Sequence, residues 1–241
     1  MKGILLAGGT GSRLYPLTRI MNKSLLPLGR KTIIEHVLST LTFAGINDLM
    51  IISGPNHFGQ LAQVLGSGKN HNCQITYRVQ DDANGIAAAL ALCEDFVGNE
   101  KFATILGDNI FEDPQQIGTQ ISKFQDSDDE FTLFAKSIED PERFGVAVYD
   151  ESGKIIDIVE KPQIAPSSDA ITGLYLYSPF VFDVIRKLSI SARGEYEISD
   201  VNSFLVKHHK GSVEHVECQW IDTGTHESYE HATEIINKKI K

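Results

Sequence analysis

The chain has 241 residues, of which 41% are hydrophobic and 22% are charged, and its formal net charge is −10. This length fits one large α/β domain, and the acidic balance excludes a general nucleic-acid surface, so any phosphate-binding cations must be local. No stretch approaches the ~20 apolar residues of a membrane span, and the short apolar run at the N-terminus meets Gly8 and Gly9 at once, unlike a signal peptide. We therefore expect a cytoplasmic protein with no nucleic-acid or membrane partner.

The first half of the chain alternates between predicted strands and helices. A continuous apolar run at Lys2–Ala7 predicts a central strand, and helical spacing after Thr32, a predicted cap, gives a helix that ends at Gly45. The elements that follow are a strand at 48–53, a helix at 57–65, a strand at 74–80, a helix at 85–96 and a strand at 101–106. This rhythm predicts an α/β fold with a doubly wound, mostly parallel (Rossmann-like) sheet.

The second half has a different pattern. Its predicted elements are strands joined by short turns, then two helices, one more strand and a last helix. The strands are expected at 131–136, 145–149, 154–160 and 172–177, the helices at 180–188 and 198–209, the next strand at 213–216, and the last helix from about Glu227. No repeat or linker interrupts the chain, so we expect a single domain over 1–241.

The loop after the first strand, LAGGTGSRL at 6–14, carries the most information. Its glycines allow the backbone to approach a polyphosphate, and Arg13 offers a planar fork to phosphate oxygens. A Walker loop is excluded because Ser12-Arg13 stands where Gly-Lys-Ser/Thr is needed, and the dinucleotide fingerprint is excluded because Leu14 stands where it needs glycine. A glycine-rich turn with a surface arginine is an equally good interpretation of these residues alone. Lys23 is a candidate second phosphate cation.

The segments LAGGTGSRLYPLT and KSLLPLG closely resemble the signature of the sugar nucleotidylyltransferases, L-A-G-G-x-G-[ST]-R-L-x-P-x-T followed by K-x-L-[LV]-P. Further motifs follow in the same order, so the resemblance covers residues 2 to about 232. It implies a Mg²⁺-dependent direct displacement in which dTTP and glucose 1-phosphate give dTDP-glucose and pyrophosphate. The alternatives are UTP in place of dTTP and, more distantly, an inactive sugar-nucleotide-binding module.

The resemblance also divides the chain and assigns its nucleotide site. Residues 1–110 are mainly for the nucleotide, 111–225 mainly for the sugar, and 226–241 form a terminal helix. Arg13, Lys23 and Lys161 are implied to be catalytic, and Asp108 and Asp222, in LGDNIF and WIDTGT, to hold Mg²⁺. From the residues alone, Asp108 could equally be a turn residue, and for Asp222 the turn residue is the favoured interpretation. The implied nucleotide-binding residues are Leu6, Ala7, Gly8, Gly9, Thr10, Gly11, Gln80 and Gly85.

The sugar site is implied by the motifs RFGV, EKP, ITGLY and RGEYEIS. Ser199 is expected to cap a helix. Ser24 and Ala88 depart from the dTTP-using members, which often have Gln at both positions. Longer members carry a further helical extension, and a homo-oligomer is left open. The implied sugar-binding residues are Asn109, Gly145, Glu160, Lys161, Ile171, Tyr175 and Arg193.

Overall fold

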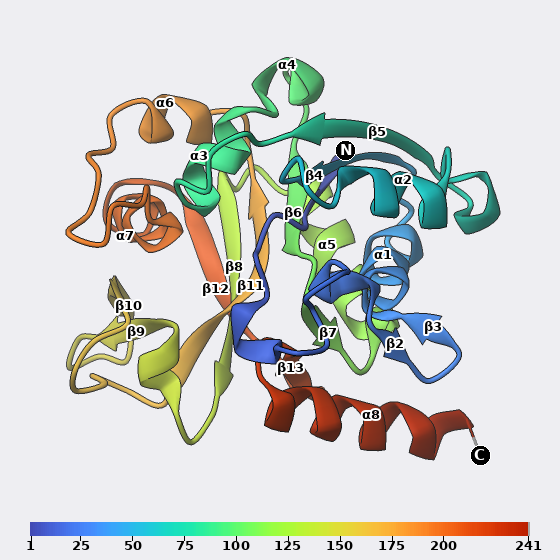
Figure 1. The fold of residues 1–241 in the computed structure, drawn as a ribbon. Coiled ribbons are helices and arrows are strands. Elements are labelled where there is room, and N and C mark those ends of the chain that lie inside the picture. Colours follow the sequence, from blue (N-terminus) through green and yellow to red (C-terminus); the bar gives the residue numbers. More distant parts are fainter. Residues whose placement is uncertain (241) are drawn as a thin grey trace.

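The structure is a computed structural model that describes residues 1–240. Its centre is a nine-stranded sheet (Figure 1). Seven of its strands lie in the order β10-β9-β11-β6-β1-β4-β5, and the other two are β8, which pairs with β11, and β12, which pairs with β8. Four strands of the first half run parallel and in direct register, as the sequence predicts. These strands are β1 (Lys2–Leu6), β4 (Asp48–Ser53), β5 (Gln74–Val79) and β6 (Phe102–Leu106).

The second half extends this sheet with antiparallel pairs. The long strand β11 lies antiparallel to β6, β8 and β9, and it therefore joins the two halves into one sheet. The mostly parallel α/β prediction is confirmed, with this antiparallel extension added. The strands are β8 (Phe131–Ser137), β9 (Gly145–Tyr149), β10 (Ile155–Glu160), β11 (Asp169–Tyr177) and β12 (Gly211–His215).

Helices cover both faces of the sheet because its strands are apolar on both sides. In β1, Leu5 packs into one core while Ile4 and Leu6 pack into the other. Helices α1 (Ile33–Phe43), α2 (Phe58–Leu65), α5 (Pro114–Asp126) and α8 (His226–Ile240) contribute to the first core. Helices α3 (Ile86–Ala91), α4 (Glu94–Val97), α6 (Val181–Ile185) and α7 (Ile198–His208) contribute to the second.

One predicted helix is divided in the structure, and another helix is not predicted. The helix expected at 85–96 is split into α3 and α4, because the backbone tightens to i→i−3 bonds at Leu92 and Cys93 and Arg78 takes the Leu92 carbonyl. Helix α5 has no counterpart among the predicted elements, although Asp113 caps it with bonds from the N–H groups of Gln115 and Gln116.

Short elements complete the chain. Two of them, β7 (Asn109–Phe111) and β13 (Trp220–Asp222), form a separate antiparallel pair that lies next to the site described below. The others are β2 (Pro27–Leu28), β3 (Lys31–Thr32), and the 3₁₀ turns Ser12–Leu14, Lys23–Leu25, Lys69–His71 and Pro141–Arg143.

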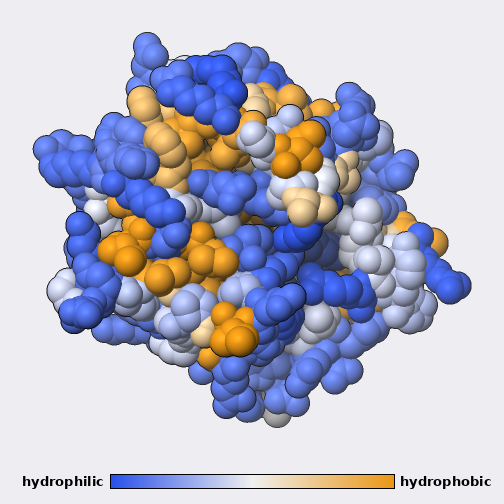
Figure 2. Space-filling model, turned by 90° about the vertical axis from the view of Figure 1, so that its left-hand side faces the viewer, coloured by the Kyte–Doolittle hydropathy of each residue, from blue (hydrophilic) through white to orange (hydrophobic). Residues whose placement is uncertain are grey.

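Within residues 1–240, none of the helices combines the length and the apolar character needed to cross a bilayer. The side of the molecule that carries α7 and β10 faces the viewer in Figure 2, where apolar patches interrupt a largely hydrophilic surface. Exposed apolar side chains on these elements include Ile156, Val159 and Phe204.

Candidate active site

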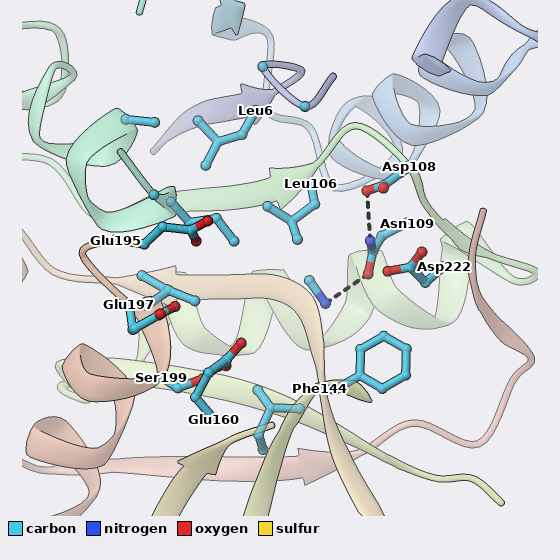
Figure 3. A pocket seen from close by; sticks show the side chains of 18 of the residues that line it. Leu6, Leu106, Asp108, Asn109, Phe144, Glu160, Glu195, Glu197, Ser199 and Asp222 are labelled. Atoms are coloured by element: carbon cyan, nitrogen blue, oxygen red, sulfur yellow. Dashed lines mark hydrogen bonds between the residues drawn. The ribbon is translucent and has the colours of Figure 1, made fainter. Parts of the chain in front are cut away.

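A cavity of about 370 Å³ opens at the carboxyl ends of β1 and β6 (Figure 3). Leu6 and Leu106 are paired residues of these parallel strands, so the loops that follow them lie side by side. The cavity brings together fifteen of the residues that the sequence singles out. They are Leu6, Gly8, Gly9, Arg13, Lys23, Gln80, Gly85, Asp108, Asn109, Glu160, Lys161, Ile171, Tyr175, Arg193 and Asp222.

Four of the predicted residues do not line the cavity. Ala7 is buried and its carbonyl accepts a bond of 2.8 Å from Asn22 Nδ2, while Thr10 is exposed. Gly11 has a φ of 66°, and its carbonyl accepts 2.6 Å from the Thr18 hydroxyl. The bonds to the carbonyls of Ala7 and Gly11 fix the backbone of the loop, so these two residues give the loop its shape. At Gly145, an added Cβ would lie 2.5 Å from Ser199 Oγ, so the free space there is used by a protein hydroxyl.

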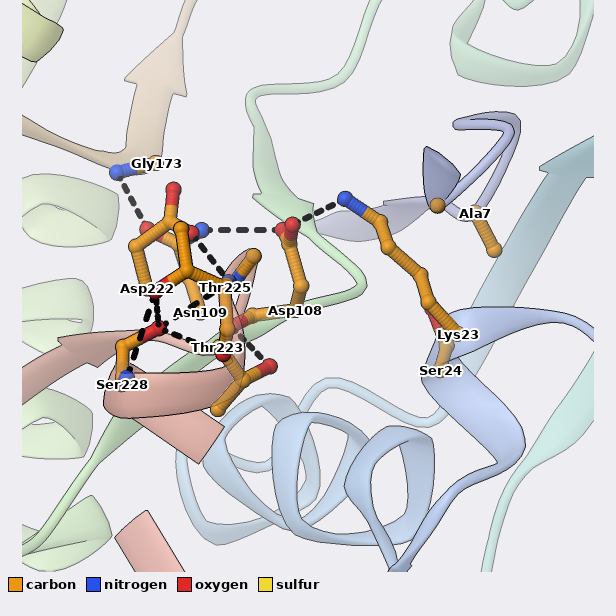
Figure 4. A network of polar contacts seen from close by, with 12 residues as sticks. Ala7, Lys23, Ser24, Asp108, Asn109, Gly173, Asp222, Thr223, Thr225 and Ser228 are labelled. Atoms are coloured by element: carbon orange, nitrogen blue, oxygen red, sulfur yellow. Dashed lines mark hydrogen bonds and ion pairs between the residues drawn. The ribbon is translucent and has the colours of Figure 1, made fainter. Parts of the chain in front are cut away.

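Asp108 and Asp222 are neighbours although they are far apart in the sequence. Strand β13 pairs with β7, which places Asp222 opposite Asn109. The backbone N–H and the hydroxyl of Thr223 both donate to the Asp108 carbonyl at 2.9 Å. Figure 4 shows Asp222 and Thr223 beside Asp108, with Lys23 reaching it from the other side. The long-range pairing therefore assembles an acid pair at the edge of the sheet.

One carboxylate of this acid pair, that of Asp222, forms no ion pair within residues 1–240. Lys23 Nζ forms a buried ion pair with Asp108; burial by itself would lower the lysine pKa, but the carboxylates of Asp108 and Asp222 raise it. Burial, and then the like charge of Asp108, raise the pKa of Asp222 to about 6. Within residues 1–240 no third His, Cys, Asp or Glu completes a cluster around them. Two carboxylates with spare charge suit a divalent cation that also takes oxygens from a ligand.

Arg13 is available to an anion. Its side chain is exposed, and its guanidinium forms no hydrogen bond or ion pair with any other residue that the structure describes. It lies close to the acid pair, because a Cβ added at Gly224 would be 2.9 Å from Arg13 Nη2. A Cβ added at Gly9 would be 3.1 Å from Lys23 Cε, so this glycine gives the lysine its path into the cavity. Arg13 and Lys23 therefore both lie next to the acid pair, on the side of the glycine loop.

Gln80 has a fixed amide orientation. Its Nε2 donates to Asn84 Oδ1 at 3.0 Å and to the Gly85 carbonyl at 3.3 Å, which uses both N–H groups. Its Oε1 lies 3.3 Å from where a Cβ on Gly8 would be, so a side chain at position 8 would crowd this oxygen. Gln80 is therefore presented to the cavity as a hydrogen-bond acceptor.

Charged and polar groups also meet at the opposite end of the cavity. Glu160 ends β10, where its Oε1 accepts 3.0 Å from Arg193 and its Oε2 accepts 2.5 Å from Ser199. The prediction that Ser199 caps a helix is wrong: the cap position is Glu197, and Ser199 lies inside the first turn of α7. Lys161 lies 3.5 Å from Glu160 and has a φ of 41°, a left-handed conformation that is uncommon for a residue with a Cβ.

Asn109 has a structural task in addition to its place in the cavity wall. Its Oδ1 accepts bonds from the Gly173 backbone N–H at 2.8 Å and from Trp220 Nε1 at 2.7 Å, and its Nδ2 donates to Asp108 Oδ1 at 3.1 Å. Because the acceptor is fully used, this side chain holds Asp108 in place between β11 and β13.

Comparisons with known proteins show which family the chain belongs to. The family model described as nucleotidyl transferase matches residues 2–239. This chain belongs to the nucleotidyl transferase family. It is 40% identical over 238 residues to glucose-1-phosphate thymidylyltransferase of Neisseria meningitidis serogroup A, with 98% of this chain and 82% of the relative covered. The family resemblance inferred from the motifs is thereby confirmed.

Two solved structures show the same fold. A Bacillus anthracis protein provisionally named as a glucose-1-phosphate thymidylyltransferase, in complex with sucrose, is 48% identical with a TM-score of 0.92, covering 98% of this chain and 95% of that one. A UDP-glucose pyrophosphorylase complexed with UDP-glucose is 24% identical with a TM-score of 0.84, covering 99% and 98%. The second likeness shows the fold alone.

Several cavity residues of this nucleotidyl transferase are not among the predicted site residues. Glu195, Glu197 and Ser199 come from the same RGEYEIS segment as Arg193. The motif could therefore be found in the sequence, but it does not show which of its side chains point into the cavity. Phe144 and Trp220 contact each other edge to face, with ring centroids 5.0 Å apart. Their contact joins two distant segments, and no sequence signal would have found it.

Proposed function

We propose that this nucleotidyl transferase transfers a thymidylyl group from dTTP to α-D-glucose 1-phosphate, giving dTDP-glucose and pyrophosphate. The observation that carries the proposal is one cavity in which the acids Asp108 and Asp222 separate two sets of cations. Arg13 and Lys23 lie on the side of the glycine loop, and Lys161 and Arg193 lie at the other end. Two cation sets are what a triphosphate and a second, phosphorylated substrate require.

The residues fit a Mg²⁺ ion, because Asp108 and Asp222 are neighbouring carboxylates (Figure 4) that both line the cavity, and carboxylate oxygens are the ligands that this ion prefers. Asp108 and Asp222 would hold the ion. When bound, Mg²⁺ would supply positive charge that neutralises phosphate oxygens in the transition state. Asn109 keeps Asp108 oriented for this role, since its amide bridges Asp108 to the neighbouring strands.

The remaining residues act by positioning and charge. The phosphate of a sugar phosphate is largely ionised at neutral pH, so it attacks the α-phosphorus without a general base, and we assign none. Lys161 would aim that phosphate, while Arg13 and Lys23 would stabilise the departing pyrophosphate. Loss of one such contact commonly costs ~3–4 kcal/mol of transition-state stabilisation. Glu160 would accept hydrogen bonds from sugar hydroxyls, with Ile171 and Tyr175 forming the apolar wall beside it.

The orientation of Gln80 favours particular bases. With both N–H groups bonded inside the protein, its free acceptor needs a donor on the base, as N3–H of thymine or uracil provides. Cytosine has no hydrogen at N3, and pairing with it would leave a buried acceptor unsatisfied. This argument selects thymine and uracil together, so UTP is the alternative substrate.

A substrate panel tests the proposal. Purified protein with MgCl₂ would be incubated with dTTP, UTP or dCTP and with the 1-phosphates of glucose, galactose, mannose and N-acetylglucosamine, and pyrophosphate release would be measured. We expect the highest kcat/KM for dTTP with glucose 1-phosphate and at least a hundredfold lower value for dCTP. Binding of these compounds without pyrophosphate release would instead indicate an inactive sugar-nucleotide-binding module.

The proposal extends to the domain organisation of the chain and to its cellular location. We propose that one domain spans the chain, with residues 1–110 mainly binding the nucleotide and 111–225 mainly binding the sugar. Its substrates and product are small phosphorylated molecules of the cytoplasm, which is where we place the enzyme.

A further inference from the structure

The segment Arg193–Glu197 touches the base-recognition loop through its main chain. Tyr196 N–H donates to the Asn84 carbonyl at 2.9 Å, and the Tyr196 carbonyl accepts from Ala87 N–H at 3.3 Å. Gly85 lies between these two bonds with a φ of 107°, and an added Cβ would be 2.5 Å from the Tyr196 carbonyl oxygen. Gly85 is therefore required for this contact, both by its backbone conformation and by the space it leaves.

The same segment is a tight turn that holds its own shape. Ser191 N–H donates to the Glu195 carbonyl and Gly194 N–H donates to the Ser191 carbonyl, both at 2.9 Å. Gly194 has a φ of 78°, which suits a turn. The Ser191 hydroxyl also donates to Glu197 Oε1 at 2.8 Å, so the two ends of the turn are tied together. A displacement of Tyr196 would consequently move the whole turn.

Arg193 stands at the tip of this turn and is surrounded by carboxylates. Its guanidinium is 3.0 Å from Glu160, 3.4 Å from Glu197 and 3.7 Å from Glu195. Glu197 is the buried one of these three acids, with 7% exposure. Burial is the largest influence on its pKa and raises it, although the hydrogen bond from Ser191 and the charge of Arg193 act in the opposite direction. A buried carboxylate on one side and Glu160 on the other fix where the guanidinium points (Figure 3 labels Glu160, Glu195 and Glu197).

We propose that the Arg193–Glu197 turn couples the two substrate subsites, with Glu197 as the positioning residue for Arg193. Binding of the base fixes the loop from Gln80 to Ala87, the loop fixes Tyr196, and the turn then holds Arg193 beside Glu160. The inference rests on the proposed function, in which Arg193 serves the sugar phosphate. Because coupling between two binding sites is reciprocal, each substrate should strengthen binding of the other, and a change at the Gly85 contact should weaken this effect.

Steady-state kinetics of two loop variants test this coupling. Gly85→Ala places a Cβ against the Tyr196 backbone, whereas Asp82→Ala changes an exposed side chain of the same loop. At saturating dTTP, we expect Gly85→Ala to raise KM for glucose 1-phosphate about tenfold, the loss expected for one misplaced charge-assisted contact. Asp82→Ala should leave KM for both substrates within twofold of wild type.

A second pair of variants covers the case in which Gly85→Ala does not fold. Glu197→Gln keeps the shape of the side chain and removes its charge, and it should raise KM for glucose 1-phosphate about tenfold while kcat falls less than threefold. Glu195→Gln, at an acid whose side chain is 41% exposed, should have a smaller effect. If folded Gly85→Ala or Glu197→Gln keeps the wild-type KM for glucose 1-phosphate, the coupling is overturned and the proposed function stands. If wild-type protein forms no sugar nucleotide, the proposed function itself fails.

Discussion

The two halves of the sheet build their parts of the site in different ways. Up to Phe111, the polar groups lie in loops directly after parallel strands, so each group is placed by the end of its own strand. Beyond that point, groups are placed by antiparallel register, as where Glu160 pairs with Gly145 and Asp222 with Asn109. The first kind of site can be located from a contiguous motif, and the second depends on which strands pair.

The halves also differ in how their cations are held. On the nucleotide side Arg13 is exposed and makes no polar contact within residues 1–240. On the sugar side, Lys161 and Arg193 are already paired with Glu160. The sugar side is therefore pre-organised by its own charges, whereas Arg13, unlike the ion-paired Lys23, is left available to a ligand.

The largest effect is expected where the halves meet. Asp108→Asn and Asp222→Asn should each lower kcat by about three orders of magnitude or more, because each removes half of the acid pair that would hold the metal. The thermal midpoint should change little for Asp222→Asn, since the variant also relieves repulsion between two buried carboxylates. Asp81→Asn, at an exposed acid near the base loop, is the matched control. Near-normal turnover in either variant would remove that acid from the metal site.

A smaller effect is expected on the nucleotide side. Arg13→Ala should lower kcat about a hundredfold, in line with the loss of one contact to a transition-state charge. Its thermal midpoint should stay within about 1 °C of wild type, because Arg13 contributes no ion pair to the folded protein. Arg19→Ala, at an exposed arginine outside the cavity, should leave both quantities unchanged. A clear loss of stability in Arg13→Ala would contradict the contrast between the two sides.

The smallest effect concerns stored strain on the sugar side. Lys161 has a φ of 41°, and its N–H donates to the Phe144 carbonyl at 2.9 Å, which extends the pairing of β9 and β10. Lys161→Ala and Lys161→Gly remove the same ammonium and should reduce activity equally. The glycine variant should nevertheless unfold at a midpoint about 2 °C above the alanine variant, because ~1 kcal/mol of left-handed backbone strain is relieved. Equal midpoints in calorimetry would show that the strain is negligible.

The sequence predicted the parallel half of the fold closely, because apolar runs followed by glycine mark buried strands and their loops. It also correctly predicted that Asp108, Gln80 and Arg13 follow the carboxyl ends of parallel strands, where the cavity lies. The pairing of β7 with β13 could not be derived, since it joins two three-residue segments with no local pattern. Asp222 was found only through its motif.

Other differences come from side-chain direction. Ser199 has the residue type of a helix cap, but its hydroxyl donates to Glu160 because β10 packs against α7. The space left by Gly145 is taken up by that same hydroxyl. Such contacts depend on tertiary packing, which residue type and spacing do not encode.

The anchoring of Thr223 to the Asp108 carbonyl has a consequence for synthesis of the protein on the ribosome. The strands and the glycine loop of the amino-terminal half emerge early, but the second acid of the pair arrives only when Asp222 and Thr223 leave the exit tunnel and dock on β7. A nascent chain that already presents Gln80 and Arg13 therefore lacks one acid of the proposed metal site until the segment with Asp222 docks.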